Sequence, residues 1–277
     1  MSFSNPYDTA AAPTFAQLRA ACLAISAEKS AVDEFFEIFR QLTPPFQNLL
    51  GQIFAQPGLW EAFVRGPSSR RGHHCGRGEN LRHSVEVARL SLCIAATSFE
   101  TLVDSDVLIV TALLHDLGKA LEYQEGVCRT KMSPLGRLVG HKSSGFGMVW
   151  GPLHSTSGIG ECQRLAILNS LSSSENAAAK DVRGPASFEA LIVSRADQLS
   201  AAGDLFRASH AASGSNAGFG VRHDHQRETP YHVKPRLPLP AQATLAAQAT
   251  QRPSLEQRLQ AAVKISSRYY GSTLRRA

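Results

Sequence analysis

The stretch ALLHDLGKALEY (residues 112–123) places a histidine and an aspartate, His115 and Asp116, inside a run of leucines. Burying two polar groups without partners costs several kcal/mol. An interhelical hydrogen bond or a shared metal ion would each satisfy the pair, and the stretch by itself leaves both readings open. Its apolar residues recur at steps of three and four, which predicts a helix with one buried face: Val110, Leu113, Leu114, Leu117 and Leu121.

Two further polar residues lie in predicted helices. His83, in NLRHSVEVARL, falls in the first turn of one helix, and Asp197, in SFEALIVSRADQLSAAGD, falls in the middle of another. A buried carboxylate in an apolar helix needs a partner. Together with His115 and Asp116 these residues would form a mixed nitrogen and oxygen site. Such a site suits one divalent ion (Mn, Mg, Fe, Co or Zn) with positions left open for water and substrate.

Helical periodicity continues on both sides of this stretch. Asn80 is a candidate N-cap for a helix at 81–98, and Gly118 a candidate C-cap of positive φ for a helix at 105–117. No segment alternates with period two, so we predict an all-α domain over 13–206, after a disordered N-terminus at 1–12. The other predicted helices cover 14–25, 31–42, 46–66 (one or two), 161–173 and 186–203, with short pieces near 135–143.

The C-terminal quarter differs in composition and charge. Residues 207–252 are poor in large apolar side chains and rich in Pro, Gly, Ala and Ser, which predicts a flexible linker. Residues 253–277 predict one basic amphipathic helix. Residues 1–206 hold 18 Lys and Arg against 20 Asp and Glu, whereas residues 207–277 hold 11 against 3. The basic extension therefore either contacts phosphate groups or only increases solubility.

Several protein classes are disfavoured. No signal-peptide pattern precedes MSFSNPYDTAAAP and no apolar run approaches the length of a membrane span, so we expect a cytoplasmic protein with no membrane partner. The oligomeric state stays open. An odd number of scattered cysteines predicts reduced thiols rather than a disulfide framework: Cys22, Cys75, Cys93, Cys128 and Cys162.

The order of the polar residues is specific. His83, then His115 with Asp116, then Asp197, resembles the HD-domain superfamily of metal-dependent phosphohydrolases, as does Gly118-Lys119 after the pair. HHCGRGENLRH, LVGHKS and FEALIVSRADQLSA are similar to segments in the HD domain of bacterial 3′-to-5′ exoribonucleases and of HD-type relaxases of conjugative elements. The resemblance covers about residues 45–205 and implies an HD-domain helical bundle with a flexible C-terminal extension.

The chain also departs from these relatives. Where they typically carry GGLLEH, this chain carries GENLRH, so Glu79 replaces a glycine and Arg82 replaces an acid. Relatives that hold two metals have a pair of histidines before the last helix, and LAILNSLSSSEN has none. The departures favour one ion, held by four ligands: His83, His115, Asp116 and Asp197.

The resemblance implies roles for the remaining residues. An ion at this site would lower the pKa of a bound water for attack on phosphorus, with Asp116 also accepting a proton. Lys119 either neutralises charge on the phosphoryl oxygens or faces solvent at a helix end. His141 is a candidate proton carrier and phosphate contact. Three residues in or just after the loop before the predicted helix at 81–98 are candidates for binding the substrate phosphate together with His141: His74, Arg77 and Arg82.

The predicted function is a metal-dependent phosphohydrolase, either a phosphomonoesterase or a phosphodiesterase, that acts on a nucleotide or a nucleic-acid end. Its partner would be a phosphate-containing substrate, with single-stranded nucleic acid bound by the basic extension. Two alternatives remain. The chain is a relaxase-like docking or processing component of a mobile element, or it is a catalytically decayed HD domain that senses metal or nucleotide.

Overall fold

The computed structural model describes residues 29–69, 74–124, 131–173 and 184–212, and two short strands at 218–219 and 231–232. The predicted disordered N-terminus, the helix predicted at 14–25 and the basic helix predicted at 253–277 lie outside these residues. Of the predicted linker, the structure describes only 207–212 and the two strands. All the helices belong to the compact unit that contains residues up to 215.

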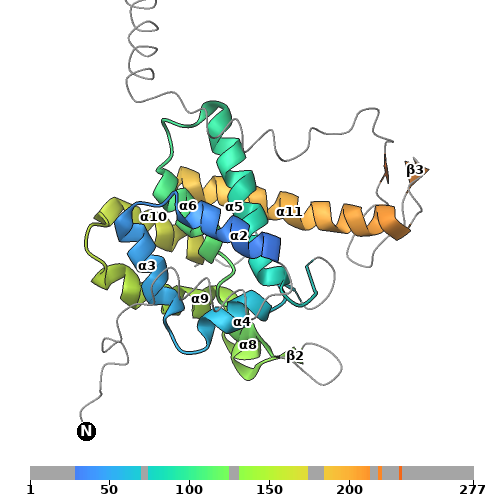
Figure 1. Ribbon diagram of the computed structural model, residues 1–277, viewed down its shortest axis with the longest axis horizontal. Helices are drawn as coiled ribbons and strands as arrows, with labels where there is room; N and C mark the ends of the chain where they lie inside the picture. The colour runs from blue at the N-terminus through green and yellow to red at the C-terminus, as the bar shows by residue number, and fades with distance from the viewer. Residues whose placement is uncertain are drawn as a thin grey trace, which may run out of the picture. The chain divides into compact units, whose positions relative to one another are not determined.

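The prediction of an all-α domain is confirmed (Figure 1). The strands have two residues each: β1 (Tyr123–Gln124) pairs antiparallel with β2 (Lys131–Met132), and β3 (Gly218–Phe219) pairs with β4 (Tyr231–His232). The helices are α2 (Lys29–Phe39), α3 (Pro44–Phe54), α4 (Leu59–Arg65), α5 (Glu79–Ser98), α6 (Ser105–Leu114), α7 (Lys119–Glu122), α8 (Pro134–Leu138), α9 (Gly140–Ser155), α10 (Glu161–Ser172) and α11 (Phe188–Ala212).

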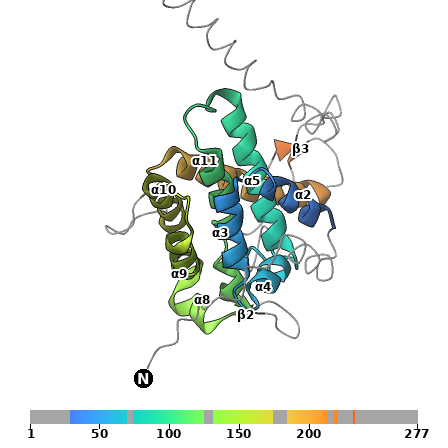
Figure 2. The same cartoon turned by 60° about the vertical axis from the view of Figure 1, so that its left-hand side comes forward.

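Helix α6 lies in the middle of the domain, where it contacts α3, α5, α10 and α11 (Figures 1 and 2). Every residue from Val107 to Leu114 is buried, because this segment is apolar on all sides apart from Thr111. The predicted buried face is confirmed at Val110, Leu113, Leu114 and Leu117, but burial extends around the whole of α6. Leu121, assigned to that face, lies in α7 and is partly exposed.

Several helix boundaries differ from the prediction, and two of them lie near the predicted polar residues. Helix α5 begins at Glu79, after Gly78 at φ +81°, so Asn80 lies fully buried in the first turn rather than at the N-cap. Helix α6 ends at Leu114 instead of residue 117. Its N-cap is Asp104, whose carboxylate accepts a hydrogen bond from the Val107 N–H at 3.1 Å.

Gly118 does not act as a C-cap of positive φ, because its φ is −63°. A Cβ at this position would lie 1.8 Å from the carbonyl oxygen of His141 and 2.8 Å from the backbone nitrogen of Gly145. The glycine is required by close approach: the start of α7 packs directly against the backbone of α9. This approach brings His141 toward the His115-Asp116 pair.

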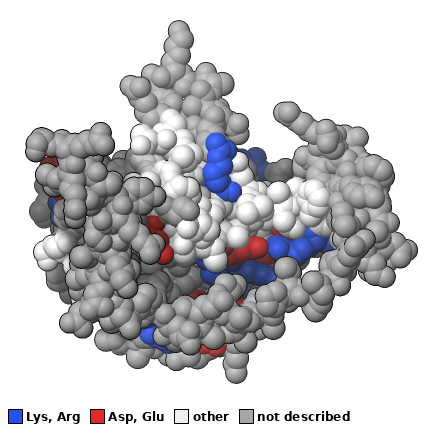
Figure 3. Space-filling model, turned by 90° about the horizontal axis from the view of Figure 1, so that it is seen from above, with Lys and Arg blue, Asp and Glu red and all other residues white. Residues whose placement is uncertain are grey.

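The charges of the described surface are mixed. On the face seen in Figure 3, Lys and Arg lie beside Asp and Glu instead of forming one basic area. Opposite charges are also paired in ion pairs such as Arg89 with Glu34 at 2.6 Å and Arg207 with Glu86 at 3.2 Å. Among the described helices, none is both long and apolar enough to cross a membrane.

We expect Gly118→Ala to destabilise the domain by about 3 kcal/mol or more, because the new methyl group would overlap the His141 backbone. Gly147→Ala is the matched control: it lies in α9, and a Cβ there would meet nothing within 4 Å. The control should be neutral or stabilising by up to about 1 kcal/mol. Denaturant unfolding measures both, and equal stability of the two variants would contradict the close-approach argument.

Candidate metal centre

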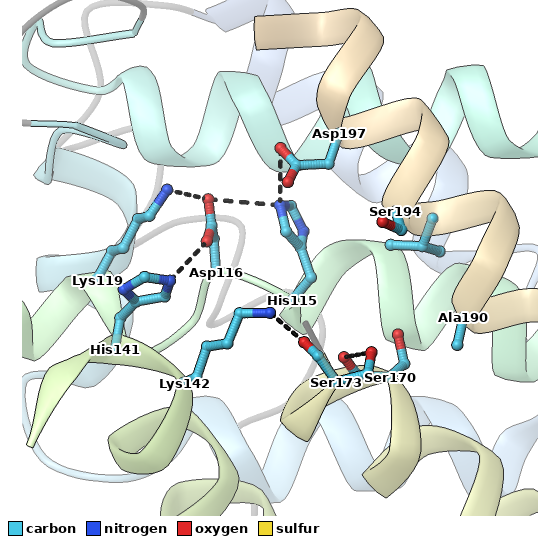
Figure 4. Close-up of a pocket in the computed structure, with 11 residues that line it drawn as sticks. His115, Asp116, Lys119, His141, Lys142, Ser170, Ser173, Ala190, Ser194 and Asp197 are labelled. Carbon is cyan, nitrogen blue, oxygen red and sulfur yellow. Dashed lines mark hydrogen bonds and ion pairs between the residues drawn. The ribbon is translucent and has the colours of Figure 1, made fainter. Parts of the chain in front are cut away.

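Three side chains from three parts of the fold bring their ligand atoms within 4.8 Å of one another: His83 on α5, His115 directly after α6, and Asp197 on α11. The two Nε2 atoms are 3.2 Å apart. The Asp197 Oδ1 atom lies 3.0 Å from Nε2 of His83 and 3.8 Å from Nε2 of His115, and Figure 4 shows the second of these contacts. These donors converge on one point between the helices.

Asp116 supplies a fourth donor. Its Oδ2 atom lies 3.4 Å from Nε2 of His83 and 3.4 Å from Nε2 of His115. An ion about 2.0–2.2 Å from each ligand would separate neighbouring donor atoms by roughly 3.0–3.6 Å. The structure therefore brings the four predicted residues together, and three of them, His83, His115 and Asp197, form a group that could hold one divalent ion. Their separate roles as ligands stay predictions.

The outer nitrogen of each imidazole is held so that Nε2 can act as the donor. The Nδ1–H group of His115 donates to the Ala112 carbonyl at 2.8 Å. Nδ1 of His83 lies 3.1 Å from Oγ of Ser200, whose hydroxyl donates to Glu86 at 3.1 Å. Ser200 Oγ is thus free to accept the Nδ1 proton of His83. Such outer contacts fix the tautomer and the orientation of metal-binding histidines.

His74 lies behind this site and does not line the pocket. Its side chain is buried, with Nδ1 2.9 Å from Oε2 of Glu79 and Nε2 3.3 Å from Oγ of Ser200. Its backbone N–H donates to Asp204 at 2.8 Å, and its φ of +47° lies in the left-handed region. The hydrogen bond with His74 lowers the pKa of Glu79. The structure thus makes His74 a support for His83, in contrast to its predicted role in binding substrate.

Lys119 faces the site and not the solvent. Its ammonium lies 2.5 Å from Oδ2 of Asp116 and donates to Ser68 at 3.2 Å. Burial opposes the charge on both partners, but their attraction outweighs it, so the pKa of Lys119 is raised. Burial also disfavours the charge on Asp116, but Lys119 and His115 outweigh this effect and hold the pKa of Asp116 well below its usual range. Asp116 is therefore ionised and able to bind a cation.

A proton on His115 balances the carboxylates when no ion is bound. Burial disfavours charge on this ring, but Asp116 and then Asp197 outweigh it and raise the pKa of His115 to about 10. The pKa of Asp197 is lowered by its hydrogen bonds with His115 and His83, against the opposing effect of burial. The Nε2 proton of His115 thus takes the place that a cation would fill.

His141 lies beside the same site. Its Nε2 is 3.8 Å from Oδ1 of Asp116, and its Nδ1 is 2.7 Å from Oε2 of Glu122, although the approach is too oblique for an aligned hydrogen bond. Glu122 is buried, and a Cβ on Gly136 would collide with its backbone. The Glu122 carboxylate is therefore fixed in place next to Nδ1 of His141.

A pocket of about 130 Å³ opens onto these groups. His115, Asp116 and Asp197 form one side of it, and Lys119 and His141 lie next to them (Figure 4). The remaining lining residues come from α9, from α10 with the residue after it, and from α11: Lys142, Ser170, Ser173, Ala190, Val193 and Ser194. The pocket gives a small polar molecule access to the site.

Three predicted features take a different form in the structure. Asp197 was expected to be buried, but 43% of its side chain is exposed, because it lies at the mouth of the pocket. Arg77 and Arg82 are exposed and absent from the lining of the pocket. Arg82 instead forms an i,i+3 ion pair with Glu79 at 3.4 Å. Nothing in the described region connects these two arginines with the binding of substrate.

Five residues around the site were not among the predicted ones: Ser68, Glu86, Glu122, Lys142 and Ser200. Spacing offered a signal for two of them, since Glu86 follows His83 by three residues and Ser200 follows Asp197 by three. Residues three apart share one face of a helix. The others lie in segments whose proximity only the tertiary structure creates.

Comparison with known proteins identifies the region that carries this site. Residues 80–202 match the model of the HD domain, and this range contains all four candidate ligands. No curated protein and no solved structure matches the chain. The likeness to exoribonucleases and relaxases therefore stays a prediction.

We expect Ser200→Ala to weaken binding of Mn²⁺ by about 10- to 100-fold, because the outer nitrogen of His83 loses its partner. Ser209→Ala is the control, since Ser209 is also buried on α11 but lies nine residues farther along. Competition with a chelating dye measures both dissociation constants. Equal affinities in Ser200→Ala and wild type would show that this contact does not support the metal centre.

Binding of the ion should release about one proton below pH 9. His115, with a pKa of about 10, is protonated in the metal-free protein and must lose its Nε2 proton to become a ligand. We expect the Mn²⁺ association constant to rise about tenfold per pH unit from pH 6 to 8. Calorimetry in buffers of different ionisation enthalpy measures the number of protons released. His154→Gln, which replaces an exposed histidine, is the control. Binding without proton release would contradict this assignment.

Proposed function

We propose that this chain, which carries an HD domain at residues 80–202, is a metal-dependent phosphohydrolase that cleaves a phosphate ester of a nucleotide or of a nucleic-acid end. HD domains are typically metal-dependent phosphohydrolases. The observation that carries the proposal is the meeting of His83, His115 and Asp197 within 4.8 Å at a pocket that also contains Lys119. A cation site beside an ammonium group suits an anionic substrate.

The chain's own residues divide into those that hold an ion and those that face the substrate. His83, His115, Asp116 and Asp197 would hold it, and when bound it supplies an acidified water and positive charge for the phosphoryl oxygens. Lys119 keeps Asp116 ionised and places its ammonium at the edge of the pocket. From there it stabilises negative charge as it grows on the phosphoryl group.

His141 is positioned to move the proton that the reaction releases. Its Nε2 lies 3.8 Å from Asp116, within the pocket, and its Nδ1 lies 2.7 Å from Oε2 of Glu122. A carboxylate behind an imidazole orients the ring and stabilises its charged form. We assign to His141 the transfer of a proton to the leaving oxygen.

The two alternative readings receive less support from the described residues. A decayed domain would have no need of outer partners for its ligands, yet Ala112 and Ser200 both hold the outer nitrogens. The reading as a nucleic-acid docking component rests on the basic C-terminal residues, of which the structure describes only a few. We therefore favour the hydrolase.

The test is metal content and hydrolysis by wild type and Asp197→Asn. This carboxylate is 43% exposed, so its replacement should leave the fold intact. We expect about one ion per chain in wild type with hydrolysis of bis(4-nitrophenyl) phosphate in Mn²⁺, and at least a tenfold loss of both bound metal and rate in the variant.

Glu161→Gln serves as the matched control, because Glu161 is an exposed acidic residue in the first turn of α10 and does not line the pocket. It should keep both metal and activity. A wild-type protein that binds Mn²⁺ but hydrolyses neither phosphomonoesters nor phosphodiesters would overturn the hydrolase and favour a sensor.

A further inference from the structure

Lys142 is the pocket-lining cation that the proposed mechanism does not use. Its ammonium donates to the carbonyl oxygen of Ser173, and within the described part of the chain it pairs with no carboxylate. Lys119, in contrast, is paired with Asp116. Figure 4 shows the two ammonium groups pointing in different directions, Lys119 toward Asp116 and Lys142 toward Ser173. The two lysines therefore serve different parts of the pocket.

The position of Lys142 in its helix is unfavourable without an anion. Lys142 is the third residue of α9, whose first turn contains no acidic residue. The N-terminus of a helix carries a partial positive charge, so the helix dipole repels a lysine placed there. An anion at the same place would be attracted by the dipole and by the lysine. A bound anion would relieve this repulsion.

The charges in the pocket leave room for two anionic groups. An ion at the metal centre would offset the charges of Asp116 and Asp197, so that Lys119 and Lys142 would both face the substrate. Lys119 lies beside the ligands and suits the phosphate that reacts. Lys142 lies at another wall, next to the carbonyl of Ser173, and suits an anion that does not react.

We propose that Lys142 forms a second phosphate subsite, so that the substrate of this HD domain carries a second phosphate beside the one that is cleaved. This inference rests on the proposed function and narrows its substrate class to short nucleotide chains with a terminal phosphate. The lining next to Lys142 consists of small and hydroxyl side chains: Ser170, Ser173, Ala190 and Ser194. The hydroxyl groups of this wall can donate hydrogen bonds to a nucleotide.

The experiment compares thymidine dinucleotide with and without a 5′-phosphate, using the full chain. In EDTA, which prevents turnover, calorimetry should give at least tenfold tighter binding of the phosphorylated form to wild type. In Mn²⁺ the phosphorylated form should show at least a tenfold lower KM at a similar kcat. Lys142→Met should reduce both preferences to less than twofold.

Lys131→Met is the matched control, because Lys131 is exposed on β2 and does not line the pocket. It should keep the full preference. Equal binding of the two dinucleotides to wild type, or a preference that survives Lys142→Met, would overturn the subsite. If the binding preference depends on Lys142 but neither dinucleotide nor bis(4-nitrophenyl) phosphate is hydrolysed, the subsite stands and the hydrolase proposal fails.

Discussion

The structure depends on a buried carboxylate that lies just after a buried, largely apolar helix. Asp116 follows α6, whose residues Val107 to Leu114 are all buried, and only 6% of its own side chain is exposed. An ionised carboxylate at such depth is stable only with opposite charge and hydrogen bonds around it. Lys119, Ser68 and a protonated His115 supply them in the metal-free protein. The same arrangement fits a divalent ion, since it is already built around positive charge.

Helices α5 and α11 hold this arrangement together by reciprocal contacts. Each contributes one ligand and, three residues later, one supporting side chain: His83 with Glu86, and Asp197 with Ser200. Ser200 contacts both residues of α5, at 3.1 Å each. A shift of one helix along the other would therefore disturb ligands and supports together. The loop residue His74 adds a third contact to Ser200 and ties the loop to α11 through Asp204.

The other side of the pocket is set by the packing of α7 on α9. Gly118 allows the two backbones to approach, and α9 consequently presents His141 and Lys142 to the pocket from its first turn. The candidate ligands thus come from α5, α11 and the residues after α6, whereas Lys119, His141 and Lys142 of the pocket come from α7 and α9. Under the proposed function, this division separates the residues that would hold an ion from those that would contact the substrate.

The sequence by itself determined the all-α fold, the positions of most helices and the candidate ligands His83, His115, Asp116 and Asp197, because helical periodicity and the spacing of polar residues are local properties. It misjudged Gly118 and Asp197 and missed Glu122 and Lys142. Only the tertiary structure decided these, since backbone approach, depth of burial and the pairing of charges depend on which segments pack together. Asp116 shows the difference. Its neighbour His115 is adjacent in the sequence, but Ser68 lies 48 residues earlier and contacts Asp116 only because the chain folds.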